Sequence, residues 1–437
     1  MWKMIRTWPV CRMAALLCAS IVLGTAAMIG VYFLPTAPMF HHVEHSIEIF
    51  ATEGTHYGWA NGKHSSDIDN FTNALMLQNA IFPGSGNAVY DAILNQRAAY
   101  SETEPAEALV REVHGETPSS VATYAHYWHG YLVILKPLLC LMDVSYLRML
   151  NLMVQVLLSA WLIRKLGREF GTGAGTAYLL MYLFLNPVSL AMSFQFSTMF
   201  YIMSVMTVCM LRKFDDWDEK RRYMQMFLIA GVWTAFFDFL TYPFVSLGIP
   251  LVVFLMMRQK RGGLQTMTEG GELLLSTGVS WGIGYGGMFL GKWLVGWLLT
   301  GVNVPAEAMH QAAYRMSSQS GLDGGGTSFH APAVWFKNFI IPLHEPFGLC
   351  LLLAFLFLAW KAYRHRKEIV LAEQKVLCKL LGIVACYPFL WYAALTNHSY
   401  MHDWFTYREL AITVFAVSML HSVISAKEKM REEGRHG

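Results

Sequence analysis

The stretch TAYLLMYLFLNPVSLAMSFQFSTMFYIMSVMTVCMLRKF, residues 176–214, decides the fold of this chain. It is apolar over almost its whole length, is interrupted at Asn186-Pro187, and ends at the basic pair Arg212-Lys213. Crossing the hydrocarbon core of a bilayer takes about 20 apolar residues, and an Asn-Pro pair favours a turn. The stretch therefore predicts two membrane-spanning helices, 173–191 and 194–211, joined by a very tight turn.

The remainder of the chain has the same character. Of its 437 residues, 55% are hydrophobic and 14% are charged, whereas a soluble domain carries about 25% charged residues. We therefore predict an all-α integral membrane protein that forms a single membrane domain, 1–437, with about ten transmembrane helices. The predicted spans are 13–34, 146–163, 173–191, 194–211, 224–240, 242–257, 273–298, 347–363, 376–395 and 404–424. We interpret the first span as an uncleaved signal anchor, because it is longer than the apolar core of a typical signal peptide.

The positions of lysine and arginine predict how these spans are oriented. Every second connection is basic, whereas 187–195, 241–243 and 397–403 contain neither residue. Cationic loops resist translocation, so both termini of this multi-pass protein of the cell membrane are expected in the cytosol. The predicted topology has two extracytoplasmic loops, 35–145 and 299–346, and a cytosolic tail, 426–437. The Gly/Ser-rich tract 317–328 in the second loop is either a lid over substrate or a plain solvated loop.

The apolar stretch WHGYLVILKPLLCLMDV, residues 128–144, is too short for a clear span and contains Lys136-Pro137. Counting it as a span would also place the basic cluster 164–168 outside. We therefore predict an amphipathic helix in the outer membrane interface, with Trp128, Tyr127 and Tyr131 as interfacial anchors.

The order of these pieces resembles the GT-C superfamily of membrane glycosyltransferases. The resemblance rests on YWHGYLVILKPLLCLMDVSYLRMLNLMVQVLLSAWLIRKLGREFG (127–171), on 176–214 and on AGVWTAFFDFLTYPFVSLGIPLVVFLMM (230–257). It covers about residues 1–260 by architecture, and beyond that only the alternation of spans agrees. It implies a large first loop with juxtamembrane helices, a polyprenyl-phosphate-linked sugar as donor and an extracytoplasmic acceptor. It implies contact with membrane lipid and no nucleic-acid partner, and it leaves a divalent metal, Mg²⁺ or Mn²⁺, optional.

A reaction of this kind needs a carboxylate that accepts the proton of the acceptor hydroxyl. The candidates are Asp69, Asp67 and Glu44. Asp67 and Asp69 are two residues apart, so they can share a metal or a sugar, or act as a base with a supporting partner. The structural alternative is that Ser66 or Asp67 caps the following helix. Glu44 lies in the motif HHVEH, whose histidines are either metal ligands or part of an exposed interfacial helix.

Cationic groups are also needed, because they stabilise the departing lipid phosphate. Arg408 in the polar segment 397–409 is the first candidate, with His398 or His402 as additional donors; an internal ion pair is the alternative. Lys292 either contacts phosphate, pairs with Asp238, or extends its side chain to the interface. Asp238 is functional or is satisfied by water or Thr241. Arg148 and His129 lie at or next to the interfacial stretch and are further candidates for binding substrate or phosphate.

The leading prediction is therefore a glycosyltransferase that uses a polyprenyl-phosphate sugar and acts on an envelope glycan, lipid or protein. A transporter or flippase is the main alternative. Broken midplane helices and internal repeats are typical of transporters, and we find no convincing repeat in this sequence. A non-catalytic membrane protein of envelope assembly is the third.

Overall fold

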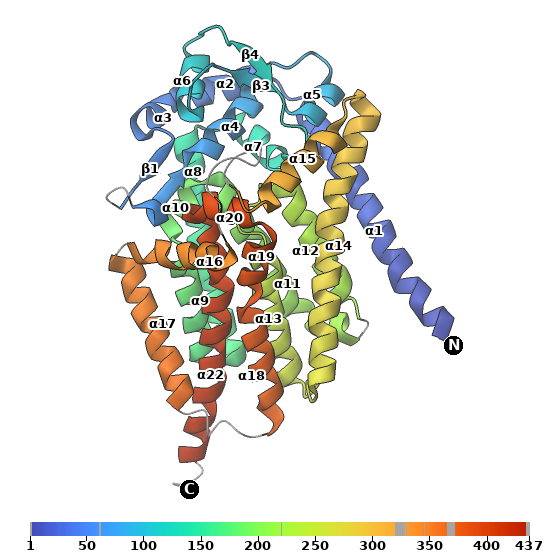
Figure 1. The fold of residues 1–437 in the computed structure, drawn as a ribbon, viewed down its shortest axis with the longest axis vertical. Helices are drawn as coiled ribbons and strands as arrows, with labels where there is room; N and C mark the ends of the chain where they lie inside the picture. Colours follow the sequence, from blue (N-terminus) through green and yellow to red (C-terminus); the bar gives the residue numbers. More distant parts are fainter. Residues whose placement is uncertain are drawn as a thin grey trace.

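The computed structural model describes residues 2–60, 63–219, 221–319, 328, 330–344, 346–364 and 372–433. Long helices stand side by side in a bundle, and short elements form a cap over the end opposite the C-terminus (Figure 1). The bundle contains α1 (Trp2–Val31), α8 (Val144–Phe170), α9 (Thr172–Phe184), α11 (Phe194–Glu219), α12 (Tyr223–Phe237), α13 (Val245–Lys260), α14 (Met267–Thr300), α17 (Pro346–Arg364), α18 (Ala372–Ala385), α19 (Tyr387–Ala394) and α22 (Ala411–Glu433).

Among the described residues, five helical stretches are long and apolar enough to cross a membrane. They are Val10–Val31, Val144–Phe170, Phe194–Glu219, Met267–Thr300 and Gln374–Ala394. Each corresponds to one of the predicted spans. The fold is thus helical and fits a multi-pass membrane protein.

Other predicted spans form shorter helices. The predicted spans 224–240 and 242–257 become α12 and α13, of 15 and 16 residues. At 1.5 Å per residue they measure roughly 22–24 Å, less than the hydrocarbon core of about 30 Å. The span 173–191 is divided between α9 and α10 (Pro187–Met192). The number of ten spans therefore stays a prediction.

The tight turn at Asn186-Pro187 is confirmed. Asn186 adopts a left-handed conformation (φ 60°), and its side chain caps α10 by accepting a hydrogen bond from the Ser189 amide. Asparagine tolerates this conformation better than most residues, and Pro187 is suited to the first position of a helix. The turn therefore follows from local chemistry.

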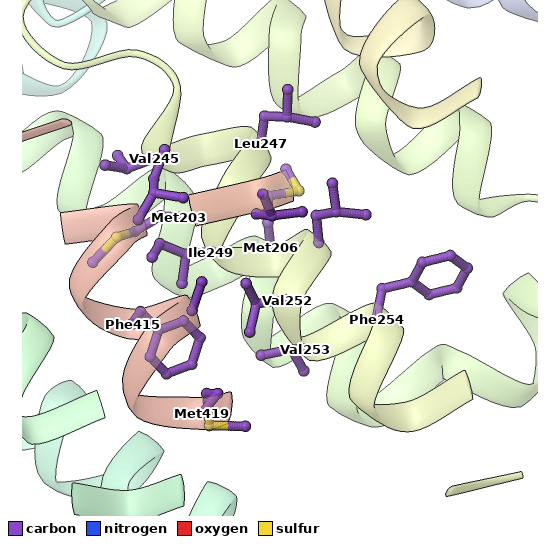
Figure 2. Packing of buried hydrophobic residues seen from close by; sticks show 14 of the residues in the cluster. Met203, Met206, Val245, Leu247, Ile249, Val252, Val253, Phe254, Phe415 and Met419 are labelled. Atoms are coloured by element: carbon purple, nitrogen blue, oxygen red, sulfur yellow. The ribbon is translucent and has the colours of Figure 1, made fainter. Parts of the chain in front are cut away.

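Helix α13 lies at the centre of the bundle. Every side chain from Val245 to Met257 is buried, and this apolar surface packs against α11 and α22 (Figure 2). A helix that is apolar on all sides is stable only inside a protein or a membrane. Helix α13 is thus surrounded by other helices, and it can be apolar on all sides although it is shorter than the hydrocarbon core.

Helices α12 and α14 approach each other through glycine. A Cβ on Gly231 would lie 2.1 Å from the carbonyl oxygen of Trp281, and one on Gly284 would lie 2.1 Å from that of Leu228. The glycines of α14 differ in their surroundings. Gly284 allows close packing, whereas Gly282 and Gly286 have nothing within 4 Å.

The cap is built mainly from the first loop. It contains α2 (Thr36–His45), α3 (Ile47–Glu53), β1 (His56–Gly58), η1 (His64–Ser66), β2 (Asp67–Asp69), α4 (Asn70–Ile81), α5 (Ala88–Leu94), β3 (Arg97–Ala99), α6 (Pro105–Val113), β4 (Ser120–Ala122) and α7 (Leu132–Leu139). The strands form two antiparallel pairs, β1–β2 and β3–β4. Later segments join the cap: α15 (Val304–Met316), α16 (Ala331–Ile340), η2 (Ile341–His344), α20 (Thr396–Met401), α21 (Asp403–Thr406) and η3 (Tyr407–Leu410).

The predicted interfacial anchors are not at the surface. Tyr127, Trp128 and Tyr131 are buried, and the indole Nε1 of Trp128 donates to the backbone oxygen of Met288 on α14 at 2.7 Å. The prediction that these three residues are interfacial anchors was wrong, because residues 127–131 pack against other helices. Two predicted segments lie partly outside the described residues. They are the tract 317–328, of which 320–327 are not described, and the tail 426–437, of which 434–437 are not described.

Candidate functional site

Two carboxylates lie on strand β2, which pairs with β1 so that Asp69 faces His56 and Asp67 faces Gly58. Residues two apart in a strand point to the same face. Asp67 and Asp69 are both buried, with exposures of 5% and 1%. The strand therefore presents both carboxylates together at the junction between cap and bundle.

The site is held against the bundle by the turn before α10. The side chain of Asn186 donates to the backbone oxygen of Ser65 at 3.1 Å, and the Ser189 hydroxyl donates to that of Ser66 at 2.9 Å. The Tyr407 hydroxyl also donates to the Ser65 oxygen, at 3.1 Å. Three side chains thus fix the position at which β2 begins.

Asp69 caps helix α4. Its Oδ1 accepts from the Thr72 amide at 2.9 Å, and its own amide donates to the Ser193 hydroxyl at 2.9 Å. The structural alternative had assigned this cap to Ser66 or Asp67, and the structure assigns it to Asp69 instead. Its Oδ2 is buried and has no hydrogen-bond partner among the described residues. Burial raises the pKa of the Asp69 carboxyl above its ordinary value, and the bonds from Thr72 oppose that rise.

Asp67 has a different environment. Its Oδ2 lies 3.1 Å from Nδ1 of the largely exposed His64. Burial raises the pKa of the Asp67 carboxyl, while the hydrogen bond with His64 opposes the rise. Asp67 is thus slightly more exposed than Asp69, and its hydrogen-bond partner His64 is in contact with solvent.

Arg408 supplies a buried cation beside these carboxylates. Its Nε donates to Leu185 O at 3.1 Å and its Nη1 to Trp404 O at 3.2 Å. The guanidinium lies 4.2 Å from the ring centre of Phe196 and 4.7 Å from that of Tyr407. Nη2 has no partner among the described residues. The charge of Arg408 favours ionisation of both Asp67 and Asp69. Its neighbour Tyr407 is bonded to Ser65 O, just before β2, so Arg408 and the two carboxylates lie in one region.

We call Asp67, Asp69, Arg408 and His56 the carboxylate site. His56 also favours ionisation of both carboxylates, and its ring packs edge-on against Trp404 at 6.2 Å. Sequence reasoning missed His56 because its place depends on the register of β1 against β2. The signal in the sequence was a histidine that precedes a turn, followed by the strand Asp67-Ile68-Asp69, because a strand before the turn would pair with the strand after it.

A large apolar cavity of about 700 Å³ lies next to the carboxylate site. It is lined mainly by α1, α7, α8, α11 and α12. The first turn of α11 separates the two: Phe194 and Ser197 line the cavity, whereas Phe196 lies against Arg408. A long hydrocarbon chain would therefore be accommodated one helix away from the carboxylates.

A metal ligand set is not evident. Among the described residues, no three His, Cys, Asp or Glu side chains gather in a way that could hold a metal ion. Asp67 and Asp69 therefore have no third ligand of these types for a Mg²⁺ or Mn²⁺ ion in this part of the chain.

His398, His402 and Asp238 do not contact Arg408. His398 Nε2 donates to Leu240 O at 2.6 Å, and its Nδ1 lies 3.1 Å from Nη1 of Arg315. His402 stacks on Phe405, and burial lowers the pKa of His402 to about 4. Asp238 accepts hydrogen bonds from Gln195 and Thr241, which closes the turn after α12. His398, with the ring of His402 at 4.9 Å, thus belongs to a second region around Arg315.

The remaining predicted site residues have partners within the protein. Lys292 donates to Ile93 O at 2.7 Å, so its proposed pair with Asp238 is not made. His129 bridges Tyr124 O and the Tyr131 hydroxyl. Arg148 donates hydrogen bonds to both carboxylate oxygens of Glu53. Glu44 is exposed, and its Oε2 lies 4.0 Å from Nδ1 of His41. The structure therefore does not bring these four to the carboxylate site.

No protein-family model, curated protein or solved structure matches this chain. The chemistry of the carboxylate site and its neighbouring cavity is therefore the basis for a proposed function.

Proposed function

We propose that the chain is a membrane glycosyltransferase that moves a sugar from a polyprenyl-phosphate donor to an extracytoplasmic acceptor, an envelope glycan, lipid or protein. The observation that carries the proposal is a pair of buried atoms in the carboxylate site, Asp69 Oδ2 and Arg408 Nη2, that have no hydrogen-bond partner among the described residues. A free carboxylate oxygen and a free guanidinium N–H are the base and the phosphate contact that this reaction needs.

In this proposal Asp69 accepts the proton of the acceptor hydroxyl. The hydroxyl oxygen forms a bond to the anomeric carbon, and the bond from that carbon to the phosphate oxygen breaks. The departing polyprenyl phosphate carries the electron pair of the broken bond, and Arg408 Nη2 stabilises its charge. The raised pKa of Asp69 suits a base, because a carboxylate with a higher pKa binds a proton more strongly.

The apolar cavity supports the polyprenyl part of the proposal. Its volume of about 700 Å³ and its apolar walls fit a segment of isoprenoid chain. The proposal also includes the ten-span topology with both termini in the cytosol and the resemblance to the GT-C superfamily. In that topology the carboxylate site faces the extracytoplasmic side.

The test uses purified protein with radiolabelled polyprenyl-phosphate glucose, mannose and galactose and an extracted envelope fraction as acceptor. The readout is release of polyprenyl phosphate. Asp69→Asn should lower release by at least about 100-fold, the scale of a lost general base. Because an asparagine Oδ1 still accepts from the Thr72 amide, this variant keeps the helix cap. Glu107→Gln, on the exposed face of α6, is the matched control and should not change release.

Normal release by Asp69→Asn would remove the base assignment. Absence of release with every donor, combined with movement of an intact lipid-linked sugar across vesicles containing the protein, would replace the proposal with a flippase. The two outcomes are separated by whether the sugar–phosphate bond is broken.

A further inference from the structure

Of the buried polar atoms that have no hydrogen-bond partner among the described residues, four lie on four neighbouring elements. They are the Tyr285 hydroxyl on α14, Trp391 Nε1 on α19, Glu409 Oε2 on η3 and Arg315 Nε on α15. A buried polar atom without a partner is rare in folded proteins and calls for an explanation such as a bound molecule. Each belongs to a side chain that the carboxylate site does not use.

These side chains face one region. The rings of Tyr285 and Trp391 lie 6.3 Å apart, and Phe244 lies 5.1 Å from Trp391. The Phe244 amide donates to Oε1 of Glu409 at 3.0 Å, which leaves Oε2 as the free oxygen. The Arg315 guanidinium lies 5.9 Å from the ring centre of Tyr127, and the Tyr127 ring lies 6.0 Å from that of Phe289, which packs on Tyr285. We call Tyr285, Trp391, Glu409 and Arg315 the inner site.

Aromatic rings surround the inner site. Tyr285 stacks on Trp281 at 4.7 Å with an interplanar angle of 13° and meets Phe289 at 5.1 Å. Leu240, which packs in the same cluster, has a φ of 65°. A branched residue in this conformation is strained, and such strain persists where the surrounding structure imposes it, commonly at binding sites.

We propose that the inner site binds a neutral, polyhydroxylated ligand, the sugar ring of a saccharide. The free atoms include donors, Trp391 Nε1 and Arg315 Nε, and an acceptor, Glu409 Oε2. A hydroxyl group can satisfy either kind, because it both donates and accepts. The aromatic walls suit the C–H face of a sugar ring.

Within the proposed function, this ligand is the sugar of the acceptor. That role rests on the proposed function, but binding of a sugar does not. Arg408 and Glu409 are neighbours in η3, yet one contacts Phe196 and the other Phe244. The inner site is therefore separate from the carboxylate site, and the two can be tested independently.

The test is saturation-transfer NMR on the full chain in lipid nanodiscs, which avoids sugar-based detergents. The probes are the methyl α-glycosides of glucose, mannose, galactose and N-acetylglucosamine. At least one should receive saturation from the protein. Tyr285→Phe, Trp391→Phe and Glu409→Gln each remove or neutralise one free atom and should weaken binding at least tenfold. Tyr146→Phe and Trp161→Phe, at exposed positions of α8, are the matched controls and should bind as the unaltered chain does.

The melting temperature is measured alongside. Tyr285→Phe removes only the hydroxyl, which has no partner among the described residues, so this variant should melt no lower than the unaltered chain. A marked fall for Tyr285→Phe would assign the hydroxyl a structural role and overturn the proposal. No saturation of any glycoside, equal binding by all variants, or binding of ammonium or inorganic phosphate in place of glycosides would also overturn it. Asp69→Asn should retain glycoside binding while losing turnover, so failure of the proposed function and failure of the inner site give different results.

Discussion

Replacement of Arg148 by methionine tests how the cap is anchored to the bundle. Arg148, on α8, donates to both carboxylate oxygens of Glu53 on α3, at 2.9 and 3.0 Å, and to Asn70 Oδ1 at 2.8 Å. Methionine keeps an apolar side chain of similar length but removes all four hydrogen bonds that the guanidinium donates, two from Nη1 and two from Nη2. Breaking a buried ion pair from one side costs about 3–5 kcal/mol, because the other charge stays buried. The Glu53 side chain is 19% exposed, so we expect the lower value, about 3 kcal/mol.

The measurement is equilibrium unfolding in mixed micelles of a mild detergent and sodium dodecyl sulfate. Arg111→Met is the matched control, because Arg111 forms a surface pair with Glu107 at side-chain exposures of 39% and 55%. Exposed pairs of this kind contribute about 0.5 kcal/mol. Adding Glu53→Gln to Arg148→Met should restore part of the lost stability, since the uncompensated charge is gone. A loss for Arg148→Met no larger than that of the control would refute the reasoning.

Three further predictions concern packing, protonation and sidedness. Gly231→Ala should lower the unfolding free energy by about 2 kcal/mol or more, because its Cβ would meet a carbonyl of α14 at 2.1 Å. Gly286→Ala, with nothing within 4 Å, should be neutral or stabilising by thermal shift. Burial raises the pKa of Glu112 from 4.5 to about 7. Between pH 4.5 and about pH 7 the native state therefore keeps a proton on Glu112 that the unfolded state has lost. Stability should therefore fall by up to about 3 kcal/mol as pH rises through that window. Glu112→Gln should remove this pH dependence in a denaturant titration. In a cysteine-free background, Ser119→Cys should react with an impermeant maleimide in intact cells and Thr268→Cys only after disruption; the reverse pattern would invert the topology.

Local chemistry made part of the fold predictable. The turn at Asn186-Pro187 follows from what these two residues prefer, and the five helices that are long and apolar enough to cross a membrane follow from long apolar runs. The place of Trp128 could not be predicted in this way. An apolar stretch with aromatic residues looks the same whether it faces lipid headgroups or the protein interior. Only the contact with Met288, 160 residues away along the chain, decides between them.

The candidate site was predictable only in part, because it depends on contacts distant in sequence. Asp69 and Arg408 could be selected as charged residues beside apolar stretches, and in the structure the charge of Arg408 acts on Asp69. His398 was expected in the same group, but its contact with Arg315 draws it to another. Tyr285 and Trp391 gave no signal, since an aromatic residue in an apolar helix is normally core. Their unpartnered polar atoms appear only when the neighbours are known.

The short helix η3 connects the carboxylate site and the inner site. A 3₁₀-helix turns about 120° per residue, so the side chains of Arg408 and Glu409 necessarily diverge. Tyr407 fixes the same turn to the segment before β2 through its bond to Ser65 O. One turn, bonded to the segment before Asp69, therefore carries both the free guanidinium N–H and the free carboxylate oxygen. A transferase must bring two substrates to a fixed distance from each other, and a single rigid turn that contacts both sites would meet that requirement.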